Sequence, residues 1–418
     1  MKILIIGSGA REHALTWAIS QNPRCTRIYC CPGNAGTATL ATNVDIDVTS
    51  NNEILEICLE YSIDMVVVGP EKQFEQGLTN ALKEKNILVF GPTQEASQLE
   101  TSKSFTKIMC KQKNIPTGNY KIFSREGDAR KFLSAQPKPF VIKADGLAAG
   151  KGVLVSSDFE EGNQFISSIF DGKIGTEKNK VIIEEYLEGQ EVSVFFAIDK
   201  NTIKYVGSAQ DYKRAFDHDR GPNTGGMGAF SPSPLLTEKH LAKIVNEIVK
   251  PTVEYMRETS SEFSGILYAG LILNKGEPKL IEYNVRFGDP ECQALCIRLG
   301  AQILDIYFSG AKNELSNLSI NEANDSAITV VVAEKGYPKN PKSGCDLNNI
   351  VNTKYDNELK IFHAGTYFEN NFLRNSGGRI FSFTVRSTNL NKARAIAYEQ
   401  LNMIENENIF YRTDIGSD

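Results

Sequence analysis

The segment 280–291 combines residue types that could hold a metal ion beside a phosphate. Glu282 and Asn284 are two apart in an expected strand, so both side chains point to one face. They offer one carboxylate and one amide oxygen, and Mg²⁺ typically takes one or two carboxylates plus phosphate oxygens and water. Arg286 continues this face and could stabilise charge on a transferring phosphoryl group. An exposed strand face is the ordinary alternative, but it fits poorly with the specific turn at 287–290, so a metal and phosphate site is favoured.

A glycine-rich segment, residues 144–152, lies between two expected strands at 141–145 and 153–156. It is not a Walker P-loop, because that loop is followed by a helix. A flexible flap between antiparallel strands can close over a triphosphate, and Lys151 and Lys143 would supply positive charge. A solvated hairpin is the alternative, but it hardly explains the run of small residues, so nucleotide binding is favoured.

Residues 184–187, followed by Glu191, fit a nucleotide hinge. The backbone at a strand edge can recognise the donor and acceptor edge of adenine, and a carboxylate a few residues on can bind ribose hydroxyls. This signal is weak alone, because Glu is common in strands.

Two further segments complete the candidate site. In 210–214, Asp211 could hold an ammonium group, while Lys213 and Arg214 could hold a carboxylate or a phosphate. Residues 221–228 are too glycine-rich for the interior of a helix or strand, so we expect an ordered loop held close to a ligand.

Three small-residue loops occur in the first hundred residues, at 7–12, 31–37 and 69–71. The first resembles half of a dinucleotide fingerprint, but Glu12 replaces the third glycine, so a phosphate-binding helix start is favoured over a nicotinamide site. Each loop alone is more typical of a turn. At successive strand ends they would line one crevice.

The elements that position these loops alternate in type. Apolar strands at 3–6, 64–68 and 87–90 each run into a glycine turn and a helix, which predicts a doubly wound parallel sheet with ligands at the carboxyl ends of its strands. Downstream we expect a helix at 101–113, strands at 181–186 and 192–198, a long helix at 237–257, a hairpin of 267–273 with 279–283 and helix to about 310. Residues 311–326 read as a polar linker. A small α+β module follows, with strands at 328–332 and 381–385 and a helix at 390–403.

Composition restricts the function further. The 418 residues carry 46 Lys and Arg against 51 Asp and Glu, a net charge of −5, which disfavours a sequence-blind nucleic-acid binder or an anionic-membrane binder. No apolar run approaches the length of a transmembrane helix, and the apolar N-terminal run is too short for a signal peptide. The eight cysteines are scattered without a CxxC pair, so we expect reduced thiols and a cytoplasmic enzyme.

These segments together resemble the ATP-grasp carboxylate–amine ligases and, more closely, the phosphoribosylamine–glycine ligase (glycinamide ribonucleotide synthetase) family. The resemblance covers essentially the whole chain, and 143–152 and 221–228 are its most specific strings. The motifs that carry it are Gly7–His13, Pro32–Thr37, Val68–Glu71, Val141–Gly152, Gly221–Gly228, Arg286–Glu291, His363–Thr366 and Gly377–Arg379.

The resemblance implies three domains. They are an N-terminal doubly wound parallel-sheet (pre-ATP-grasp) domain at 1–100, an ATP-grasp domain with antiparallel sheets at 101–320, whose glycine-rich lid spans about 117–190, and an α+β domain at 327–418. The implied reaction joins glycine to 5-phospho-β-D-ribosylamine through glycyl phosphate, giving glycinamide ribonucleotide, ADP and phosphate in purine biosynthesis. ATP is a co-substrate, Mg²⁺ or Mn²⁺ the metal, the partners are small molecules rather than nucleic acid or membrane, and the enzyme is a monomer or homodimer.

The family's functional residues carry over onto matching positions of this sequence. Glu282 and Asn284 match the metal ligands. The nucleotide contacts correspond to Lys103, Lys143, Gly146, Gly150, Lys151, Gly152, Glu184, Glu185, Tyr186, Leu187 and Glu191. Expected substrate contacts are Gly9, Arg11, Asn34, Gly69, Glu71, Gly225, Gly226 and Asp289, and expected catalytic residues are Arg286, Lys213 and Asp211.

The sequence departs from the family pattern at a few points. His218 stands where a small residue is usual and Cys292 where Thr is usual. The strand at 267–273 lacks the further carboxylate of many ATP-grasp relatives, so metal binding rests on two side chains and the ligand phosphates. Three alternatives remain open: another ATP-grasp ligase or carboxylase, a nicotinamide oxidoreductase that uses the 7–9 loop, and a non-catalytic nucleotide sensor.

Overall fold

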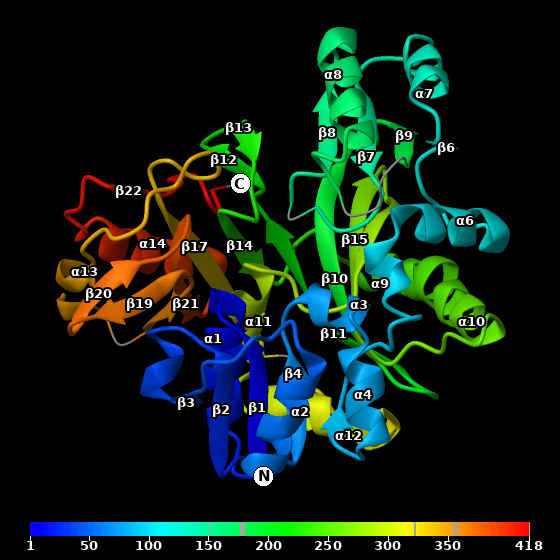
Figure 1. The fold of residues 1–418 in the computed structure, drawn as a ribbon. Helices are drawn as coiled ribbons and strands as arrows, with labels where there is room; N and C mark the ends of the chain where they lie inside the picture. Colours follow the sequence, from blue (N-terminus) through cyan, green and yellow to red (C-terminus); the bar gives the residue numbers. More distant parts are fainter. Residues whose placement is uncertain (149, 176–179, 322, 354–355, 357, 418) are drawn as a thin grey trace.

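The computed structural model describes residues 1–418 except 149, 176–179, 322, 354–355, 357 and 418. Figure 1 shows three regions: the N-terminal sheet (blue), a small four-stranded sheet at upper right, and the C-terminal strands (orange) at left. The C-terminal strands belong to a large antiparallel sheet, which begins in the centre of the molecule and is separate from the small four-stranded sheet. In the described part of the chain, no helix has the length and apolar character needed to cross a membrane.

The N-terminal region is the predicted parallel sheet, with strand order β3-β2-β1-β4-β5. Because the chain reverses direction across the sheet at β1 and β4, the loops after these strands meet at a topological switch point, where ligands of such sheets bind. Its strands are β1 (Lys2–Gly7), β2 (Arg27–Pro32), β3 (Thr42–Asn43), β4 (Met65–Val68) and β5 (Leu88–Val89). Its helices are α1 (Ala10–Ser20), α2 (Asn51–Glu60), α3 (Glu71–Glu75) and α4 (Leu78–Glu84), with a 3₁₀ turn at Thr37–Thr39.

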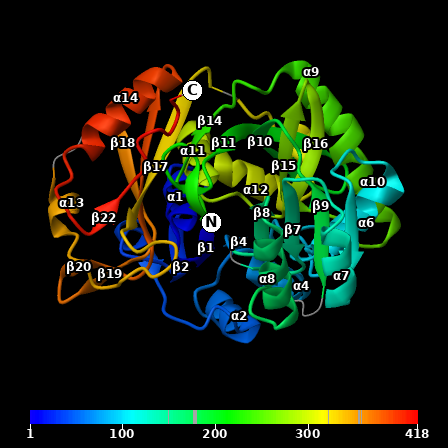
Figure 2. The ribbon, with the colours of Figure 1, turned by 90° about the horizontal axis from the view of Figure 1, so that it is seen from above.

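The large antiparallel sheet has the order β16-β15-β10-β11-β14-β17-β21-β18, and β22 pairs with β17. Figure 2 shows it running from β16 on one side of the molecule to β18 on the other. Its strands are β10 (Gln190–Ile198), β11 (Ile203–Asp211), β14 (Gly228–Ser231), β15 (Gly265–Asn274), β16 (Glu277–Asn284), β17 (Ser326–Glu334), β18 (Leu359–His363), β21 (Arg379–Ser387) and β22 (Ile409–Phe410). Short β14 pairs with both β11 and β17, so one sheet continues from the central region into the C-terminal one.

The four-stranded sheet, in the order β6-β9-β7-β8, has its own apolar core with two helices. Its elements are β6 (Tyr120–Phe123), α7 (Glu126–Leu133), β7 (Phe140–Ala144), β8 (Val153–Ser156), α8 (Phe159–Phe170) and β9 (Val181–Glu185). Antiparallel β7 and β8 flank the glycine-rich segment, as predicted. Ala149 of that segment lies outside the described residues.

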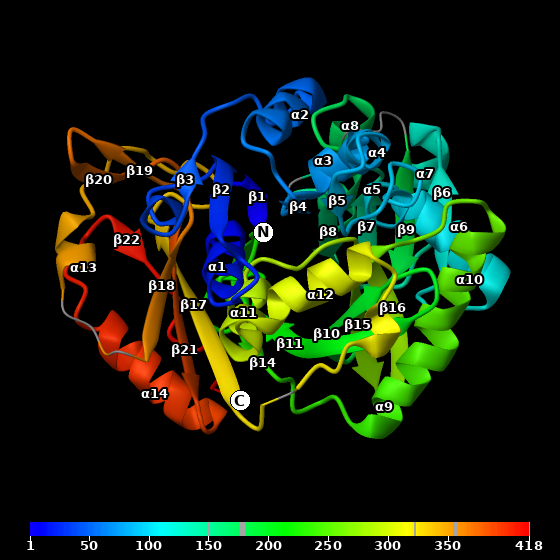
Figure 3. The same ribbon diagram turned by 90° about the horizontal axis from the view of Figure 1, so that it is seen from below.

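The remaining helices pack against these sheets. Figure 3 shows α1 beside β1, β2 and α11, while α12 contacts both β5 and the strands β10 and β15. The helices are α5 (Gln98–Thr101), α6 (Lys103–Lys113), α9 (Glu238–Lys243), α10 (Lys250–Glu258), α11 (Glu291–Leu299), α12 (Gln302–Ala311), α13 (Asn348–Asn352) and α14 (Leu390–Leu401). A π-helical turn at Ile244–Val249 joins α9 to α10, so the predicted long helix is continuous but not uniform.

Two predictions need correction. The segment 221–228 is not wholly a loop, because Arg220–Asn223 forms β13 against β12 (Arg214–Phe216) and Gly228 opens β14. A short two-stranded ribbon tolerates Gly and Pro, since few of its backbone groups need ladder partners.

The expected linker at 311–326 contains a 3₁₀ turn at Leu315–Asn317, with Leu315 fully buried. A second ribbon pairs β19 (Thr366–Glu369) with β20 (Phe372–Asn375).

Two histidines, buried His13 and half-buried His363, join the N-terminal and C-terminal regions. His13 on α1 accepts the backbone N–H of His363 at Nδ1, with N···N 2.9 Å, so its ring is neutral. Burial lowers the pKa of His13 to about 3, with a further contribution from His363, and burial lowers the pKa of His363 to about 4. This hydrogen bond between regions therefore depends on an uncharged His13 ring.

We predict that acid weakens the fold through these rings. The unfolded chain binds protons below pH 6.5, whereas the folded rings bind them only near their lowered pKa values. The stability they contribute is therefore complete above pH 6.5 and falls by about 1 kcal/mol per histidine for each pH unit below it. In urea unfolding between pH 7.5 and 5, His13→Asn, which keeps an acceptor without titrating, should lose stability less steeply than the parent. Equal slopes would contradict this.

Candidate active site

The hairpin β15–β16 carries the two expected metal ligands. Tyr283 is buried in the core, while Glu282 and Asn284 lie half-buried on the opposite face of β16, as their spacing predicts. The pairing of β16 with β15 slips between Gly270 and Leu271, which makes a bulge at this point of the strand. The bulged residue, Ile281, accepts a hydrogen bond at its carbonyl from Lys143 Nζ at 3.2 Å. The bulge therefore connects the metal-ligand strand to β7.

Cations keep Glu282 ionised. Burial alone would raise the pKa of Glu282, but Lys213, Lys143 and Lys103 outweigh burial and hold the pKa below its usual value. Lys103, at the start of α6, also donates from Nζ to the Gly146 carbonyl at 3.0 Å, which ties it to the glycine-rich segment. A charged carboxylate in a strongly cationic setting is suited to share a metal ion with an anionic ligand.

A hard divalent cation fits this donor set only in part. Glu282 and Asn284 supply oxygen ligands of the kind that Mg²⁺ takes. Among the described residues, no group of three or more His, Cys, Asp or Glu is arranged to hold a metal ion. The remaining coordination positions would therefore be filled by ligand oxygens and water.

A second charged group lies at the end of β11. Lys213 Nζ is 2.9 Å from Glu191 Oε2 and 3.8 Å from Asp211 Oδ2, so the structure brings together three residues expected to have separate roles. Burial raises the pKa of Asp211 to about 7 against the pull of Lys213. Burial opposes the charge of Lys213, but Asp211 and Glu191 raise its pKa well above the usual value. Burial thus raises the pKa of Asp211 even though the Lys213 ammonium group lies beside it.

Asp145, which the sequence analysis did not select, anchors the glycine-rich segment. Its fully buried carboxylate accepts the backbone N–H groups of Ser104 and Gly146, each at 3.1 Å, and the Ser104 hydroxyl. Gly146 (φ 82°) and Gly150 (φ 75°) adopt backbone conformations that side chains disfavour. Lys151 is exposed, and Gly152 passes so close to Ala148 that a Cβ would lie 2.6 Å from the alanine Cβ. The segment is thus held at its base and exposed at its tip.

The expected hinge, 184–187, begins in β9 and leaves the four-stranded sheet. Glu185 accepts from Asn119 Nδ2 at 2.7 Å. Tyr186 is exposed and Leu187 half-buried in the connection from β9 to β10, where the small sheet joins the large one. Glu184 is buried and faces two lysines instead of solvent.

Arg286 lies in a partly buried ion network with Glu71 and Glu100, of which the sequence analysis did not predict Glu100. Its guanidinium contacts Glu71 Oε2 at 3.0 Å and Glu100 Oε1 at 2.7 Å, and Glu100 also accepts the Val285 N–H at 2.8 Å. Arg286 lowers the pKa of Glu71 to about 2. Burial raises the pKa of Glu100 to about 7, against the pull of Arg286. Glu100 lies in α5 outside any motif, and only folding brings it to Arg286.

The first glycine loop is partly filled by the side chain of Glu12. The Gly9 N–H donates to Glu12 Oε2 at 2.7 Å, and Arg11 contacts the other oxygen at 2.6 Å. A Cβ on Gly69 would lie 1.9 Å from Glu12 Oε1, so the glycine loops make room for this carboxylate. The Gly9 N–H is therefore already engaged by a carboxylate, and phosphate binding at this helix start remains a prediction.

Asn34 links its own loop and the first glycine loop of the N-terminal sheet to the end of β18. Its Nδ2 donates to the carbonyls of Ser8 and His363, both at 2.8 Å, while its Oδ1 accepts the N–H groups of Gly36 and Thr37. The side chain holds these segments together through these contacts. Its expected contact with substrate remains a prediction.

The C-terminal region reaches this site through Arg379. Its guanidinium contacts Asp289 Oδ2 at 3.0 Å and donates to the Gly225 carbonyl at 3.0 Å, and Tyr337 Oη accepts the Gly225 N–H at 2.9 Å. Burial would raise the pKa of Asp289, but Arg379 and Arg11 outweigh burial and lower it. Gly226 (φ 114°) packs against Pro290, where a Cβ would lie 2.3 Å from its Cδ. Arg379 entered the sequence analysis only as part of a motif, and Tyr337 not at all.

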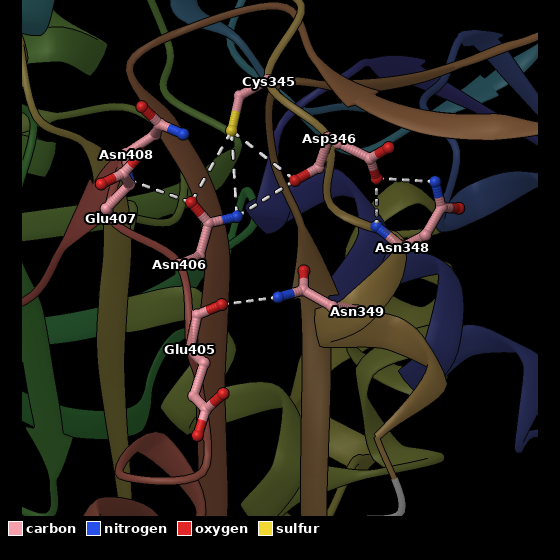
Figure 4. A pocket seen from close by; sticks show the side chains of 8 residues that line it. All are labelled: Cys345, Asp346, Asn348, Asn349, Glu405, Asn406, Glu407 and Asn408. Atoms are coloured by element: carbon pink, nitrogen blue, oxygen red, sulfur yellow. Dashed lines mark hydrogen bonds between the residues drawn. The ribbon is translucent and has the colours of Figure 1, made fainter.

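A cavity of about 530 Å³ lies elsewhere, between α13 and the segment before β22 (Figure 4). It is lined by Cys345, Asp346, Asn348, Asn349, Glu405, Asn406, Glu407 and Asn408. Side-chain amides of Asn349 and Asn406 bond across it to the carbonyls of Glu405 and Asp346. Its lining has three carboxylates and no cation, so it is unsuited to a polyphosphate.

The sequence matches three domain profiles of one family, phosphoribosylglycinamide synthetase: the N domain over 1–100, the ATP-grasp (A) domain over 101–292 and the C domain over 327–418. A protein of Brucella melitensis named phosphoribosylamine--glycine ligase is 43% identical over 416 residues, covering 100% of this chain and 97% of that protein.

Two solved structures resemble this chain over nearly its whole length. The crystal structure of phosphoribosylamine--glycine ligase from Thermotoga maritima has a TM-score of 0.87 and 31% identity, over 99% of this chain and 100% of that one. The biotin carboxylase domain of 2-oxoglutarate carboxylase from Hydrogenobacter thermophilus, solved with MgADP, has a TM-score of 0.74 at 16% identity, over 98% and 91% of the two chains. This second likeness shows the fold alone.

The ion network around Arg286 generates a prediction on stability. Arg286→Met leaves Glu71 and Glu100 without their counterion, so the free energy of unfolding at pH 7.5 should fall by about 3 kcal/mol or more. Guanidinium unfolding monitored by circular dichroism measures the change. Lys173→Met, which removes an exposed ion pair with Asp171, is the matched control and should leave stability unchanged. Equal effects of the two substitutions would show that the network is not stabilising.

Proposed function

The chain belongs to the phosphoribosylglycinamide synthetase family, and on this basis we propose that it joins glycine to 5-phospho-β-D-ribosylamine with ATP in purine biosynthesis. It is an ATP-grasp ligase. The observation that carries the proposed site is the convergence of Lys103, Lys143 and Lys213 on the half-buried Glu282, because such a cationic pocket suits a polyphosphate.

The proposed chemistry has two displacements. An oxygen of the glycine carboxylate attacks the γ-phosphorus of ATP, the bond to ADP breaks, and glycyl phosphate forms. The amine nitrogen of the ribosylamine then attacks the glycyl carbonyl carbon, the amine loses a proton, and phosphate leaves with its electron pair. Neither step needs an enzyme nucleophile, so positioning and electrostatic stabilisation are the main contributions of the protein.

On the nucleotide side, Lys103 and Lys143 would contact ATP phosphates, and the glycine-rich segment with Lys151 would close over them. The buried anchor at Asp145 and the exposed tip of the segment support this role. Residues 185–187, between the two sheets, would contact adenine, and Glu191 would contact ribose in exchange for its ion pair with Lys213.

A divalent cation, Mg²⁺ or Mn²⁺, would be held by Glu282 and Asn284 together with ATP oxygens. It would supply charge neutralisation for the transferring phosphoryl group. The lowered pKa of Glu282 supports this assignment, because the ligand must be ionised.

On the acceptor side, Asp211 and Asp289 would hold glycine, and Lys213 and Arg286 would stabilise developing negative charge. Arg379 would orient Asp289 and the Gly225 loop. The N-terminal crevice would take the ribosylamine through Gly9, Arg11, Asn34, Gly69 and Glu71. A cytoplasmic location and a monomer or homodimer remain predictions.

The direct test is ADP release from MgATP, with the ribosylamine formed in situ. We expect ADP only when both glycine and the ribosylamine are present, and loss of turnover on chelation of the metal. ADP release without glycine would contradict the proposed acceptors and indicate another ATP-grasp reaction.

Two substitutions on β16 test the metal assignment, one at the expected ligand and one as its control. Glu282→Gln should reduce turnover by at least a hundredfold without changing the circular dichroism spectrum, because the metal loses its only protein carboxylate. Glu277→Gln, on the exposed end of β16 beside Lys243, should leave turnover unchanged. Near-normal activity of Glu282→Gln would overturn the metal assignment.

A further inference from the structure

Two buried lysines share one carboxylate oxygen beneath the proposed nucleotide site. Lys107 Nζ lies 2.9 Å from Glu184 Oε2, and Lys143 Nζ lies 3.2 Å from the same oxygen. The side chains of Lys107, Glu184 and Lys143 are 4%, 5% and 3% exposed, so solvent screens this group little. The cluster therefore has one more positive charge than the carboxylate can balance.

Lys107 is held more firmly in the cluster than Lys143. Its Nζ also donates to Thr117 Oγ1 at 2.7 Å, and that hydroxyl donates to the Leu280 carbonyl at 2.6 Å. The Tyr120 hydroxyl donates to the Lys107 carbonyl at 2.7 Å, which fixes the same turn of α6. Lys143 has, besides Glu184, a single longer bond of 3.2 Å to the Ile281 carbonyl. Lys143 is thus the ammonium group that can leave at lower cost.

Glu184 depends on these lysines. Its other oxygen, Oε1, is buried without a hydrogen-bond partner in the described structure, so its charge is compensated through Oε2 alone. A buried carboxylate that loses its only counterion is strongly destabilised. If Lys143 were the sole partner, moving its ammonium group to a ligand would leave Glu184 uncompensated.

We propose that Lys107 is a positioning residue for nucleotide binding, which keeps Glu184 neutralised so that Lys143 can turn from Glu184 to an ATP phosphate. The inference rests on the proposed contact between Lys143 and ATP. No covalent bond is made or broken when Lys143 exchanges Glu184 for a phosphate. Lys107 touches no substrate and acts through Glu184, so its removal would keep Lys143 bound to Glu184.

The test compares ligands with and without phosphates. Lys107→Met should weaken MgATP binding at least tenfold by calorimetry, while adenosine affinity, measured by ligand-observed NMR, should change less than threefold. The KM for ATP should rise with little change in kcat. Lys113→Met, in the same helix at an ion pair with exposed Glu258, is the matched control and should change neither affinity.

The double variant Lys107→Met/Glu184→Gln isolates the mechanism. Without a carboxylate to hold it, Lys143 is released, so this variant should bind MgATP within threefold of Glu184→Gln alone. This comparison also serves if Lys107→Met does not fold. An unchanged MgATP affinity in Lys107→Met, an equal loss for adenosine, or a tenfold gap between the double variant and Glu184→Gln would each overturn the proposal. Failure of the parent protein to bind MgATP would instead overturn the proposed function.

Discussion

Cationic side chains from separate elements surround the half-buried carboxylate of Glu282, and the electrostatic balance there determines much of the surrounding structure. Lys103 comes from α6, Lys143 from β7, and Lys213 follows β11, yet all three lower the pKa of one carboxyl group on β16. Positive charge gathered in a poorly screened space must be compensated by anions. Part of that compensation comes from carboxylates such as Glu184 and Glu191, and a bound polyphosphate would supply the rest.

The C-terminal region also contributes side chains to the proposed site. Arg379 crosses from β21 to Asp289, and the backbone of Gly225 is held from both sides by Arg379 and Tyr337. These contacts are possible because β14 pairs with both β11 and β17, so one sheet spans the two regions. His13 and His363 make a second connection, from α1 to β18. Packing between regions therefore positions the residues of the proposed acceptor side.

The fold class and the local motifs could be predicted from the sequence because their signals are local. The two-residue spacing of Glu282 and Asn284 fixes a shared face, and apolar strands followed by glycine turns identify a parallel sheet. The partners of these motifs could not be predicted. Glu100 meets Arg286 across 186 positions, and Lys107 has no feature that distinguishes it from a surface lysine until folding brings it to Glu184. Long-range pairs of this kind are decided by packing.

Sequence patterns are less informative about the role of a residue that contacts its own loop. By its position in the motif, Glu12 only replaces the third glycine. In the structure its carboxylate fills the space beside the glycines and accepts the Gly9 N–H. Gly221–Asn223 was read as loop from its composition, although a two-stranded ribbon accommodates it. In both cases the residue types were identified correctly. The groups that these residues contact are known only from the three-dimensional structure.

In the proposed reaction, the glycine carboxylate attacks the terminal phosphate of ATP, and the protein contributes mainly by positioning the reactants. This attack is tested most directly with glycine labelled with ¹⁸O in both carboxylate oxygens, followed by mass spectrometry of the released phosphate. The mechanism predicts one ¹⁸O atom in each phosphate formed, with the other oxygen retained in the amide product. Phosphate without label, released together with the amide product, would contradict it.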